Sequence, residues 1–544
     1  MQDSIFGTLI TDQLKLVRHR ARRSGLQHNY EIEPLDPKPN KPVGIFASVG
    51  ADLDLDEVVC YYTVNGSQPT IGNGSGAEVK RAQGARVRIE WDTLSWSYLQ
   101  IWRCEIPAQT EGTLVRYRVV GMKAGKEVAY ADWPDPKFRQ EAATRAHFTN
   151  TPLPPLKPED SLTGKIFSYH VTSYPAPEWA RQAVIYHIFS DRFYPGDGRE
   201  WTQTIKLSDF CGGTLWGIGD KLDYIQELGA TAIWLSPTWP STSYHGYDVT
   251  DYQAVSKRLG GEEAMKALIQ EAHKRKIKII LDLVANHLSY EHPYFVEALA
   301  QPESPHRELF IFDESEIGYR TYFGVRSMPQ INLTNEATRK WMFDIARYWL
   351  TEFEIDGFRL DHAQGPGPEF WTEFQMTCKQ TNADSFCFGE VVEPPTEFLR
   401  YAGRVDGLLD FGFADSVRRA YGYGAMTKQE FRIFLNRHLE FLKGSGLLLP
   451  TFLDNHDMKR FLFIAGEDKQ KLRDAAELQF RLAGPPIIYY GTEVGMSEYD
   501  TDDPHDRLVG CRAPMVWNHE QDRELFSFYQ GLIRRRQQDQ PWKQ

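Results

Sequence analysis

The chain has 544 residues, of which 41% are hydrophobic and 25% charged, a composition typical of globular rather than disordered or fibrous proteins. This length exceeds one compact core of ordinary size, so we expect two or more domains. The net charge of −12 would repel nucleic acid and anionic membrane surfaces, so we expect neither as a partner.

The cellular compartment is predicted from what the sequence lacks. Asp3, Asp12, Lys15 and Arg18 interrupt the region where a secretory signal would need an apolar core. No apolar run approaches the length of a membrane-spanning helix. The six cysteines are scattered without CxxC or Cys/His spacing, which argues against zinc and against a dense disulfide framework. We therefore expect a cytoplasmic protein.

The first third of the chain is predicted to be an all-β domain. After an N-terminal extension over residues 1–40, short runs rich in β-branched and aromatic residues alternate with Gly and Asn turn signals over residues 41–150. This pattern is typical of a β-sandwich. Residues 151–158 then carry four prolines, which predicts an extended linker over residues 151–180.

From residue 181 to 540, apolar strands alternate with amphipathic helices, the rhythm of a parallel α/β fold. Eight strands are predicted near residues 183–190, 232–236, 277–284, 355–360, 385–389, 407–411, 449–453 and 486–490. They could build a doubly wound sheet or a (β/α)8 TIM barrel. Polar residues gather at the carboxyl ends of the strands, which favours the barrel. Residues 288–335, after the third strand, predict an inserted domain B.

Two of these strand ends carry carboxylates suited to different roles. Arg359 and Asp361 share one face of a strand, and an adjacent arginine should keep Asp361 ionised, as a nucleophile requires. Glu390 follows Phe386 and Phe388, whose apolar surroundings would raise its pKa and suit a general acid. Paired carboxylates in one cleft favour cleavage of a glycosidic bond. For any one of these residues, the alternative role is the cap of a following helix.

Seven ordered motifs resemble those of the α-amylase family of glycoside hydrolases. Four short motifs are residues 282–287 (DLVANH), 357–361 (GFRLD), 388–390 (FGE) and 452–457 (FLDNHD). Supporting segments are residues 219–237, 328–332 (MPQIN) and 484–493 (GPPIIYYGTE). The resemblance covers roughly residues 180–538 and implies a TIM barrel that cleaves α-glucans with retention of configuration.

The family's roles carry over to matching positions. By this resemblance Asp361 is the nucleophile, Glu390 the acid/base, and Asp457 the residue that binds the hydroxyls of the reacting sugar. The implied substrate-binding residues are Tyr247, His287, Arg359 and His456. The chemistry itself would need no cofactor, whereas Asn286 resembles the family's ligand for a structural calcium ion.

The resemblance ends on the acceptor side of the site. Many starch-degrading relatives carry a lysine-histidine pair after the nucleophile motif, but this chain has residues 362–367 (HAQGPG). It also stops where relatives continue into a C-terminal sandwich. The N-terminal sandwich is similar to that of cyclomaltodextrinases, neopullulanases and maltogenic amylases. There it contributes to dimers and shapes the cleft. Residues 61–69 also resemble a strand-turn motif of carbohydrate-associated modules, so a homodimer through this domain, glycan binding and a plain packing role all stay open.

The predicted function is therefore hydrolysis of mainly α-1,4 glucosidic bonds in maltooligosaccharides, cyclodextrins or starch-like glucans by double displacement. Two alternatives remain open at this point. One is transglycosylation or sugar isomerisation at the same site, and the other is a catalytically silent carbohydrate-binding scaffold. The intact set of Asp361, Glu390 and Asp457 argues against the silent scaffold.

Overall fold

The computed structural model describes residues 12–69, 78–133, 143, 146, 165–203, 206–498 and 510–543. These residues form two compact units. One comprises the described residues within 12–174 and 399–404, and the other those within 175–398 and 405–543. Each unit has its own hydrophobic core.

The first unit is an antiparallel β-sandwich. Its strands follow the order β1-β3-β6-β5-β4-β7-β8, with β2 on β3 and β9 on β7. Their bounds are β1 (Leu26–Gln27), β2 (Ile32–Glu33), β3 (Val43–Val49), β4 (Glu57–Thr63), β5 (Lys80–Asp92), β6 (Ser97–Ile106), β7 (Leu114–Lys123), β8 (Lys126–Tyr130) and β9 (Phe167–His170), preceded by helix α1 (Asp12–Arg23).

The long strand β5 joins the two layers. Its first residues pair with β4 and its later residues with β6. Gly84 lies where the strand changes partner, and a β-carbon there would come within 2.5 Å of the Val58 carbonyl oxygen. Buried residues of both layers, including Ile45 and Val119, share one core. The predicted sandwich is confirmed.

The segments predicted to flank the sandwich are partly built into it. Within the predicted extension 1–40, β1 and β2 pair with β3. Within the predicted linker 151–180, residues 151–164 lie outside the described part, but β9 pairs with β7. Hydrogen bonding to a neighbouring strand therefore makes these stretches part of the sheet, which is a correction to the prediction.

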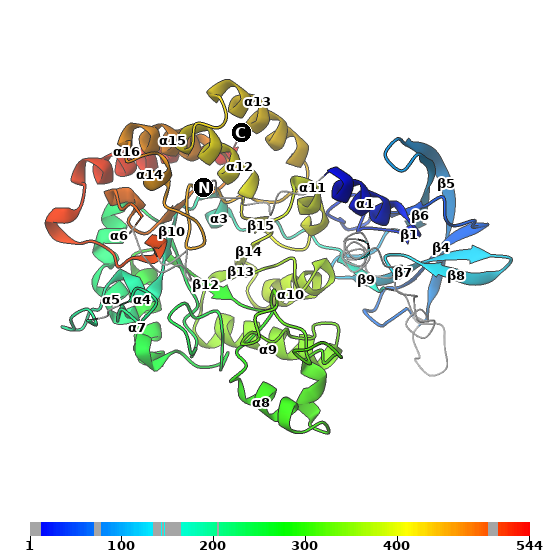
Figure 1. Cartoon of the computed structure of the whole chain (residues 1–544), viewed down its shortest axis with the longest axis horizontal. Helices are drawn as coiled ribbons and strands as arrows, with labels where there is room; N and C mark the ends of the chain where they lie inside the picture. Colours follow the sequence, from blue (N-terminus) through cyan, green and yellow to red (C-terminus); the bar gives the residue numbers. More distant parts are fainter. Residues whose placement is uncertain are drawn as a thin grey trace. The chain divides into compact units, whose positions relative to one another are not determined.

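The second unit is a parallel barrel surrounded by helices (Figure 1). Its strands are β10 (Ile185–Ile188), β11 (Ala232–Leu235), β12 (Lys278–Leu283), β13 (Gly357–Leu360), β14 (Phe386–Gly389), β15 (Gly407–Leu408) and β16 (Ile487–Tyr489). Its helices are α3 (Glu178–Gln182), α4 (Ser190–Phe193), α5 (Leu215–Asp220), α6 (Leu222–Leu228), α7 (Gly261–Lys274), α8 (Pro293–Ala300), α9 (Glu336–Glu352), α10 (Pro368–Thr381), α11 (Pro395–Phe398), α12 (Phe411–Val417), α13 (Lys428–Leu442), α14 (Phe461–Ile464), α15 (Lys469–Arg481) and α16 (Arg523–Asp539).

The predicted strand at residues 449–453 is reduced to two parallel bridges. Leu448 pairs with Gly407 beside β15, and Thr451 pairs with Pro486 beside β16. These bridges close the sheet between its two ends, so the barrel has its eighth position without a regular strand there. The predicted TIM barrel is otherwise confirmed.

Domain B is a small folded insertion between β12 and α9. It contains α8 and a short 3-10 helix, Pro305–Leu309. Isolated bridges then tie Phe310 to Ile331 and His287 to Gln330. The second bridge fixes domain B directly at the end of β12, next to the rim of the barrel.

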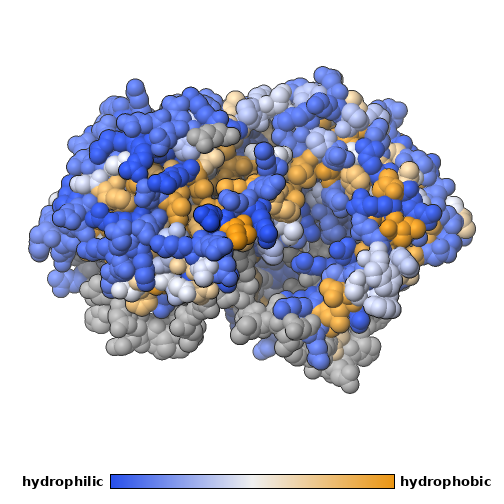
Figure 2. Space-filling view, turned by 90° about the horizontal axis from the view of Figure 1, so that it is seen from above, coloured by the Kyte–Doolittle hydropathy of each residue, from blue (hydrophilic) through white to orange (hydrophobic). Residues whose placement is uncertain are grey.

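The surface fits the sequence composition. Hydrophilic residues predominate on the face shown in Figure 2, with hydrophobic groups interspersed. Within the described ranges, no helix is long and apolar enough to cross a membrane.

Candidate functional site

The register of the barrel strands brings the predicted polar residues together. Asp282 on β12 lies directly opposite Arg359 on β13, and Arg359 lies opposite Phe388 on β14. The glycine that begins β13 is required by close packing, because a β-carbon on Gly357 would come within 2.0 Å of the Phe386 carbonyl oxygen. The motif at residues 357–361 therefore supplies both the residues that align β13 with its neighbours and the glycine that lets β13 pack closely against β14.

Arg359 is the centre of the site. Its side chain is fully buried, and its Nη1 lies 2.7 Å from Asp282 Oδ1 and 2.8 Å from Asp361 Oδ1. Its Nη2 lies 2.9 Å from Glu390 Oε2. Because neighbouring nitrogens of one guanidinium hold Asp361 and Glu390, the two carboxyl groups lie close together.

Burial raises the pKa of Glu390, while the guanidinium of Arg359 opposes this rise and the carboxylate of Asp457 adds to it. Glu390 Oε2 also accepts a hydrogen bond of 3.0 Å from the backbone N–H of His362. The direction agrees with the sequence prediction. A group with a raised pKa stays protonated to higher pH, as a general acid must.

The pKa of Asp361 differs from the sequence prediction, in which the adjacent Arg359 keeps this carboxyl group ionised. Burial raises its pKa well above the ordinary value, and Arg359 only opposes that rise, whereas Glu390 and Asp282 reinforce it. The reason is that one buried guanidinium is shared by three carboxylates, so its single charge cannot compensate all of them. Asp361 and Glu390 therefore behave as a pair that retains a proton to higher pH than an isolated carboxyl group.

Asp457 has the opposite electrostatics. Burial disfavours its charge, but His456 and Arg512 outweigh this effect and lower the pKa of Asp457. Its Oδ2 lies 3.0 Å from His456 Nε2, and its Oδ1 accepts a 2.8 Å hydrogen bond from Arg512 Nη2. Its side chain is 39% exposed, against 10% for Asp361 and 12% for Glu390. Asp457 is thus an ionised carboxylate at the open side of the site.

Arg512 is a site residue that the sequence analysis missed. It follows β16, and besides Asp457 its guanidinium donates to the His456 carbonyl oxygen at 2.7 Å and the Tyr244 hydroxyl at 3.0 Å. The side chain is 9% exposed. The only sequence signal was an arginine beside a cysteine in an irregular segment, which is too common to single out.

Tyr247 and His456 form the wall between Asp457 and Asp282. The Tyr247 hydroxyl donates to Asp282 Oδ2 at 2.9 Å and lies 2.7 Å from His456 Nε2, and the two rings stack with centroids 5.3 Å apart. Trp234 donates a further hydrogen bond of 3.1 Å to Asp282 Oδ2. Asp282 is therefore fully engaged, and it positions Arg359 and Tyr247.

Domain B contributes aromatic rings on the opposite side. His287 stacks on Tyr322 with ring centroids 4.5 Å apart, and His362 makes edge contacts with Tyr322 and Phe323 at 5.0 and 5.3 Å. Burial lowers the pKa of His287 to about 3, so its imidazole is neutral. Phe323 is 78% exposed, which leaves its ring available beside His362. His362, the first residue of the segment 362–367 that departs from the family pattern, therefore contacts the rings of Tyr322 and Phe323.

The described surroundings of Asn286 do not fit the calcium ion that the resemblance implies. Its side-chain oxygen lies against Gly365, where a β-carbon would come within 2.0 Å, and its Nδ2 lies 3.3 Å from His287 Nδ1. Among the residues that the structure describes, no three His, Cys, Asp or Glu side chains cluster as metal ligands. Calcium prefers several oxygens, usually including carboxylates, so a single neutral amide oxygen does not fit it.

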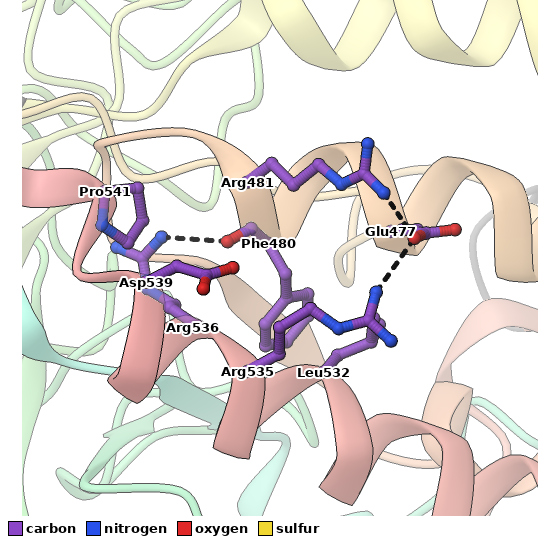
Figure 3. Close-up of a pocket in the computed structure, with 8 residues that line it drawn as sticks. All are labelled: Glu477, Phe480, Arg481, Leu532, Arg535, Arg536, Asp539 and Pro541. Carbon is purple, nitrogen blue, oxygen red and sulfur yellow. Dashed lines mark hydrogen bonds and ion pairs between the residues drawn. The ribbon is translucent and has the colours of Figure 1, made fainter.

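A separate pocket lies between α15 and α16, with a volume of about 330 Å3 (Figure 3). Its lining residues are Glu477, Phe480, Arg481, Leu532, Arg535, Arg536, Asp539 and Pro541. Glu477 pairs with both Arg481 and Arg535, and Arg536 donates to the carbonyl oxygens of Phe480 in the last turn of α15 and of Gly484 beyond it. None of the predicted site residues lines this pocket.

The fold and the site define the class of protein. Carboxyl groups gather at the carboxyl ends of barrel strands, one pair sharing a guanidinium and a third ionised carboxylate at the open side. This is the arrangement expected of a glycoside hydrolase built on a TIM barrel.

Comparison with known proteins identifies the family. Residues 187–527, more than half of the chain, match the family described as "Alpha amylase, catalytic domain". The chain therefore belongs to the alpha-amylase family and is a glycoside hydrolase.

Similar proteins include Alpha-amylase 2 of Dictyoglomus thermophilum, which is 40% identical over 70% of this chain and 69% of its own length. Neopullulanase 2 of Thermoactinomyces vulgaris is 36% identical over 67% of this chain and 64% of its own.

Solved structures agree on the fold. A cyclic α-maltosyl-(1→6)-maltose hydrolase from Arthrobacter globiformis, 31% identical, covers 66% of this chain and 83% of its own with a TM-score of 0.61. A cyclomaltodextrinase at 24% identity covers 94% of this chain and 84% of its own with a TM-score of 0.62. The second likeness extends over nearly the whole chain.

Proposed function

We propose that this enzyme hydrolyses mainly α-1,4 glucosidic bonds of maltooligosaccharides, cyclodextrins or starch-like glucans, with retention of configuration. The observation that carries this proposal is the pair Asp361 and Glu390 on one guanidinium. A retaining enzyme needs two carboxyl groups close together, one protonated and one ionised. The names of similar proteins, among them cyclomaltodextrinase and maltogenic α-amylase, support the choice of glucan.

In the first half of the reaction, protonated Glu390 gives its proton to the glycosidic oxygen, and Asp361 attacks the anomeric carbon. The bond between that carbon and the leaving oxygen breaks, and the glucosyl unit becomes an ester of Asp361. Arg359 orients Asp361 and balances its charge before attack. Because Asp361 and Glu390 share a proton, holding it on Glu390 leaves Asp361 as the nucleophile.

In the second half, ionised Glu390 takes a proton from water, whose oxygen attacks the anomeric carbon and releases Asp361. Positive charge develops on the sugar in both transition states. The ionised carboxylate of Asp457, held by His456 and Arg512, binds sugar hydroxyls and stabilises that charge. Tyr247 supplies the ring against which the sugar stacks, and His287 a neutral hydrogen-bonding imidazole.

A direct test uses Glu390→Gln and Asp361→Asn with Asp344→Asn as a control, since Asp344 lies on α9 with its side chain 46% exposed and pairs only with Lys340 and Arg347 among the described ion pairs. The two site variants should lose maltooligosaccharide hydrolysis by orders of magnitude, and the control should keep it. Full activity of either site variant would contradict the assigned roles. Transfer of glucosyl units to sugar acceptors instead of water, at high substrate concentration, would favour the transglycosylase alternative.

Two finer expectations belong with this proposal. We infer a cytoplasmic location, supported by the similarity to an intracellular maltogenic amylase of Bacillus subtilis, 31% identical, and tested by cell fractionation. We also infer a homodimer through the N-terminal sandwich, which analytical ultracentrifugation tests. A monomer at micromolar concentration would contradict it.

A further inference from the structure

His187 is a buried histidine that the proposed mechanism does not use. It lies on β10, directly opposite Trp234 on β11 and Tyr489 on β16 in the parallel register. Paired residues of neighbouring strands point to the same side of a sheet, and Trp234 belongs to a core cluster built from strands all around the barrel. His187 therefore points into the barrel, and both its side chain and that of Trp234 are fully buried.

The imidazole of His187 packs against two rings of the candidate site. It stacks on Trp234 with ring centroids 3.6 Å and planes 5° apart, and it makes an edge contact with His456 at 5.2 Å. Trp234 in turn donates its indole N–H to Asp282 at 3.1 Å, and the guanidinium carbon of Arg359 lies 5.2 Å from the centre of the Trp234 ring. His187 is thus linked to the Asp282–Arg359 pair through the Trp234 ring.

Hydrogen bonding does not explain the choice of histidine at this position. Within the described residues, neither ring nitrogen of His187 has a hydrogen-bond partner, and burying such a group costs free energy that an apolar side chain would avoid. Burial lowers the pKa of His187, so the ring is neutral and adds no charge beside Arg359. What His187 supplies is a small, flat, neutral ring. A residue that costs stability where it lies points to a role in the reaction.

We propose that His187 is a positioning residue for the hydrolysis, which holds the Trp234 indole so that its N–H stays on Asp282. Asp282 then keeps Arg359 in the orientation that presents Asp361 to the sugar. This role rests on the proposed function, in which Asp361 is the nucleophile. A displacement of about 1 Å in a reacting group can cost about 10²-fold in rate, so loss of this support should affect the transition state more than substrate binding.

The test uses His187→Leu, which keeps a buried side chain of similar volume but removes the flat ring. Ile185→Val is the matched control, since Ile185 lies two residues earlier on the same face of β10 and is equally buried. Hydrolysis of maltotriose gives kcat and KM, and urea unfolding gives the midpoint.

His187→Leu should lower kcat about 10–100-fold with little change in KM. Its unfolding midpoint should be at least as high as that of Ile185→Val, because the unpaired nitrogens leave with the ring. Ile185→Val should keep the kcat of the parent. An unchanged kcat in His187→Leu would overturn the proposal. An equal loss of kcat in Ile185→Val would also overturn it, since loosening of the barrel would then account for both.

A double-mutant cycle tests whether His187 acts through Trp234. Trp234→Phe keeps a ring for the stack but removes the N–H that binds Asp282. If His187 acts by holding that N–H, adding His187→Leu to Trp234→Phe should lower kcat by far less than it does in the parent. Equal fold losses in the two backgrounds would show that the residues act independently and would overturn the proposal.

Hydrogen exchange of the Trp234 indole N–H tests the same contact without a substrate. In protein with isotope-labelled tryptophan, the indole signal that is absent from Trp234→Phe belongs to Trp234. Its exchange should be faster in His187→Leu than in Ile185→Val. This result in a parent enzyme that hydrolyses no α-glucan would refute the proposed function and leave the support of Trp234 by His187 standing. Hydrolysis by the parent, with equal exchange in the two variants, would do the reverse.

Discussion

The shared guanidinium of Arg359 makes a prediction about stability. Arg359→Met keeps a side chain of similar length but leaves Asp282, Asp361 and Glu390 without their common positive partner. Removing one partner from a buried ion pair typically costs about 3–5 kcal/mol. Because three carboxylates lose the same partner, we expect a loss in the free energy of unfolding at the upper end of that range at pH 7.

The cost should depend on pH in a defined direction. Burial already raises the pKa of Asp361 and of Glu390, and loss of Arg359, which opposes that rise, should raise both further. Stability linked to a raised pKa is fully present below the unfolded value and is lost as pH rises through the folded value. The deficit of Arg359→Met should therefore be largest near neutral pH and shrink as the pH falls toward about 4, the ordinary carboxyl range.

The assay is urea unfolding followed by circular dichroism, at several pH values. Arg359→Lys, which keeps the charge, is the matched control and should lose less. Adding Glu390→Gln to Arg359→Met should recover part of the loss, since one uncompensated carboxylate disappears. A deficit of equal size at every pH, with no recovery in the double variant, would show that the cost is one of packing and refute the electrostatic reasoning.

Three further predictions concern the remaining groups. Glu390→Gln should lower hydrolysis about 10²–10⁴-fold and remove the decline in activity as pH rises through the raised pKa of Glu390. It should not lower the midpoint of urea unfolding, and a lowered midpoint would contradict the energetic cost assigned to burying the Glu390 carboxylate. Arg512→Lys should lower kcat/KM about tenfold or more, because the hydrogen bond from Arg512 to Asp457 is lost. Tyr244→Phe, which removes the other side-chain partner of Arg512, should have little effect. Equal losses of kcat/KM in the two variants would argue against a specific role of the Arg512–Asp457 pair. Dialysis against EDTA should leave the unfolding midpoint unchanged, and a rise on adding calcium would overturn the conclusion about Asn286.

The barrel and its rim were predictable because their signals are local. Apolar runs such as residues 277–284 mark buried parallel strands, and polar residues at their carboxyl ends must meet at one edge. One strand was over-predicted. Residues 449–453 have the apolar pattern of a strand, but they bond to both neighbours only through isolated bridges.

The parts of the site that were not predictable depend on distant contacts. Arg512 reaches Asp457 from an irregular segment after the last strand, where no periodicity indicates which way a side chain points. The pKa of Asp361 depends on Asp282 and Glu390 as well as on Arg359 two residues away. The sequence shows Arg359 two residues from Asp361, but Asp282 and Glu390 come close to Asp361 only in the folded structure.

The stereochemistry of the first product tests the central claim most directly. Proton NMR of the parent enzyme with a maltooligosaccharide or a cyclodextrin should show the α-anomer first, followed by slow mutarotation to the equilibrium mixture. This result is required if Asp361 forms a glucosyl ester that water then displaces. An initial β-anomer would contradict the double displacement and the roles proposed for Asp361 and Glu390.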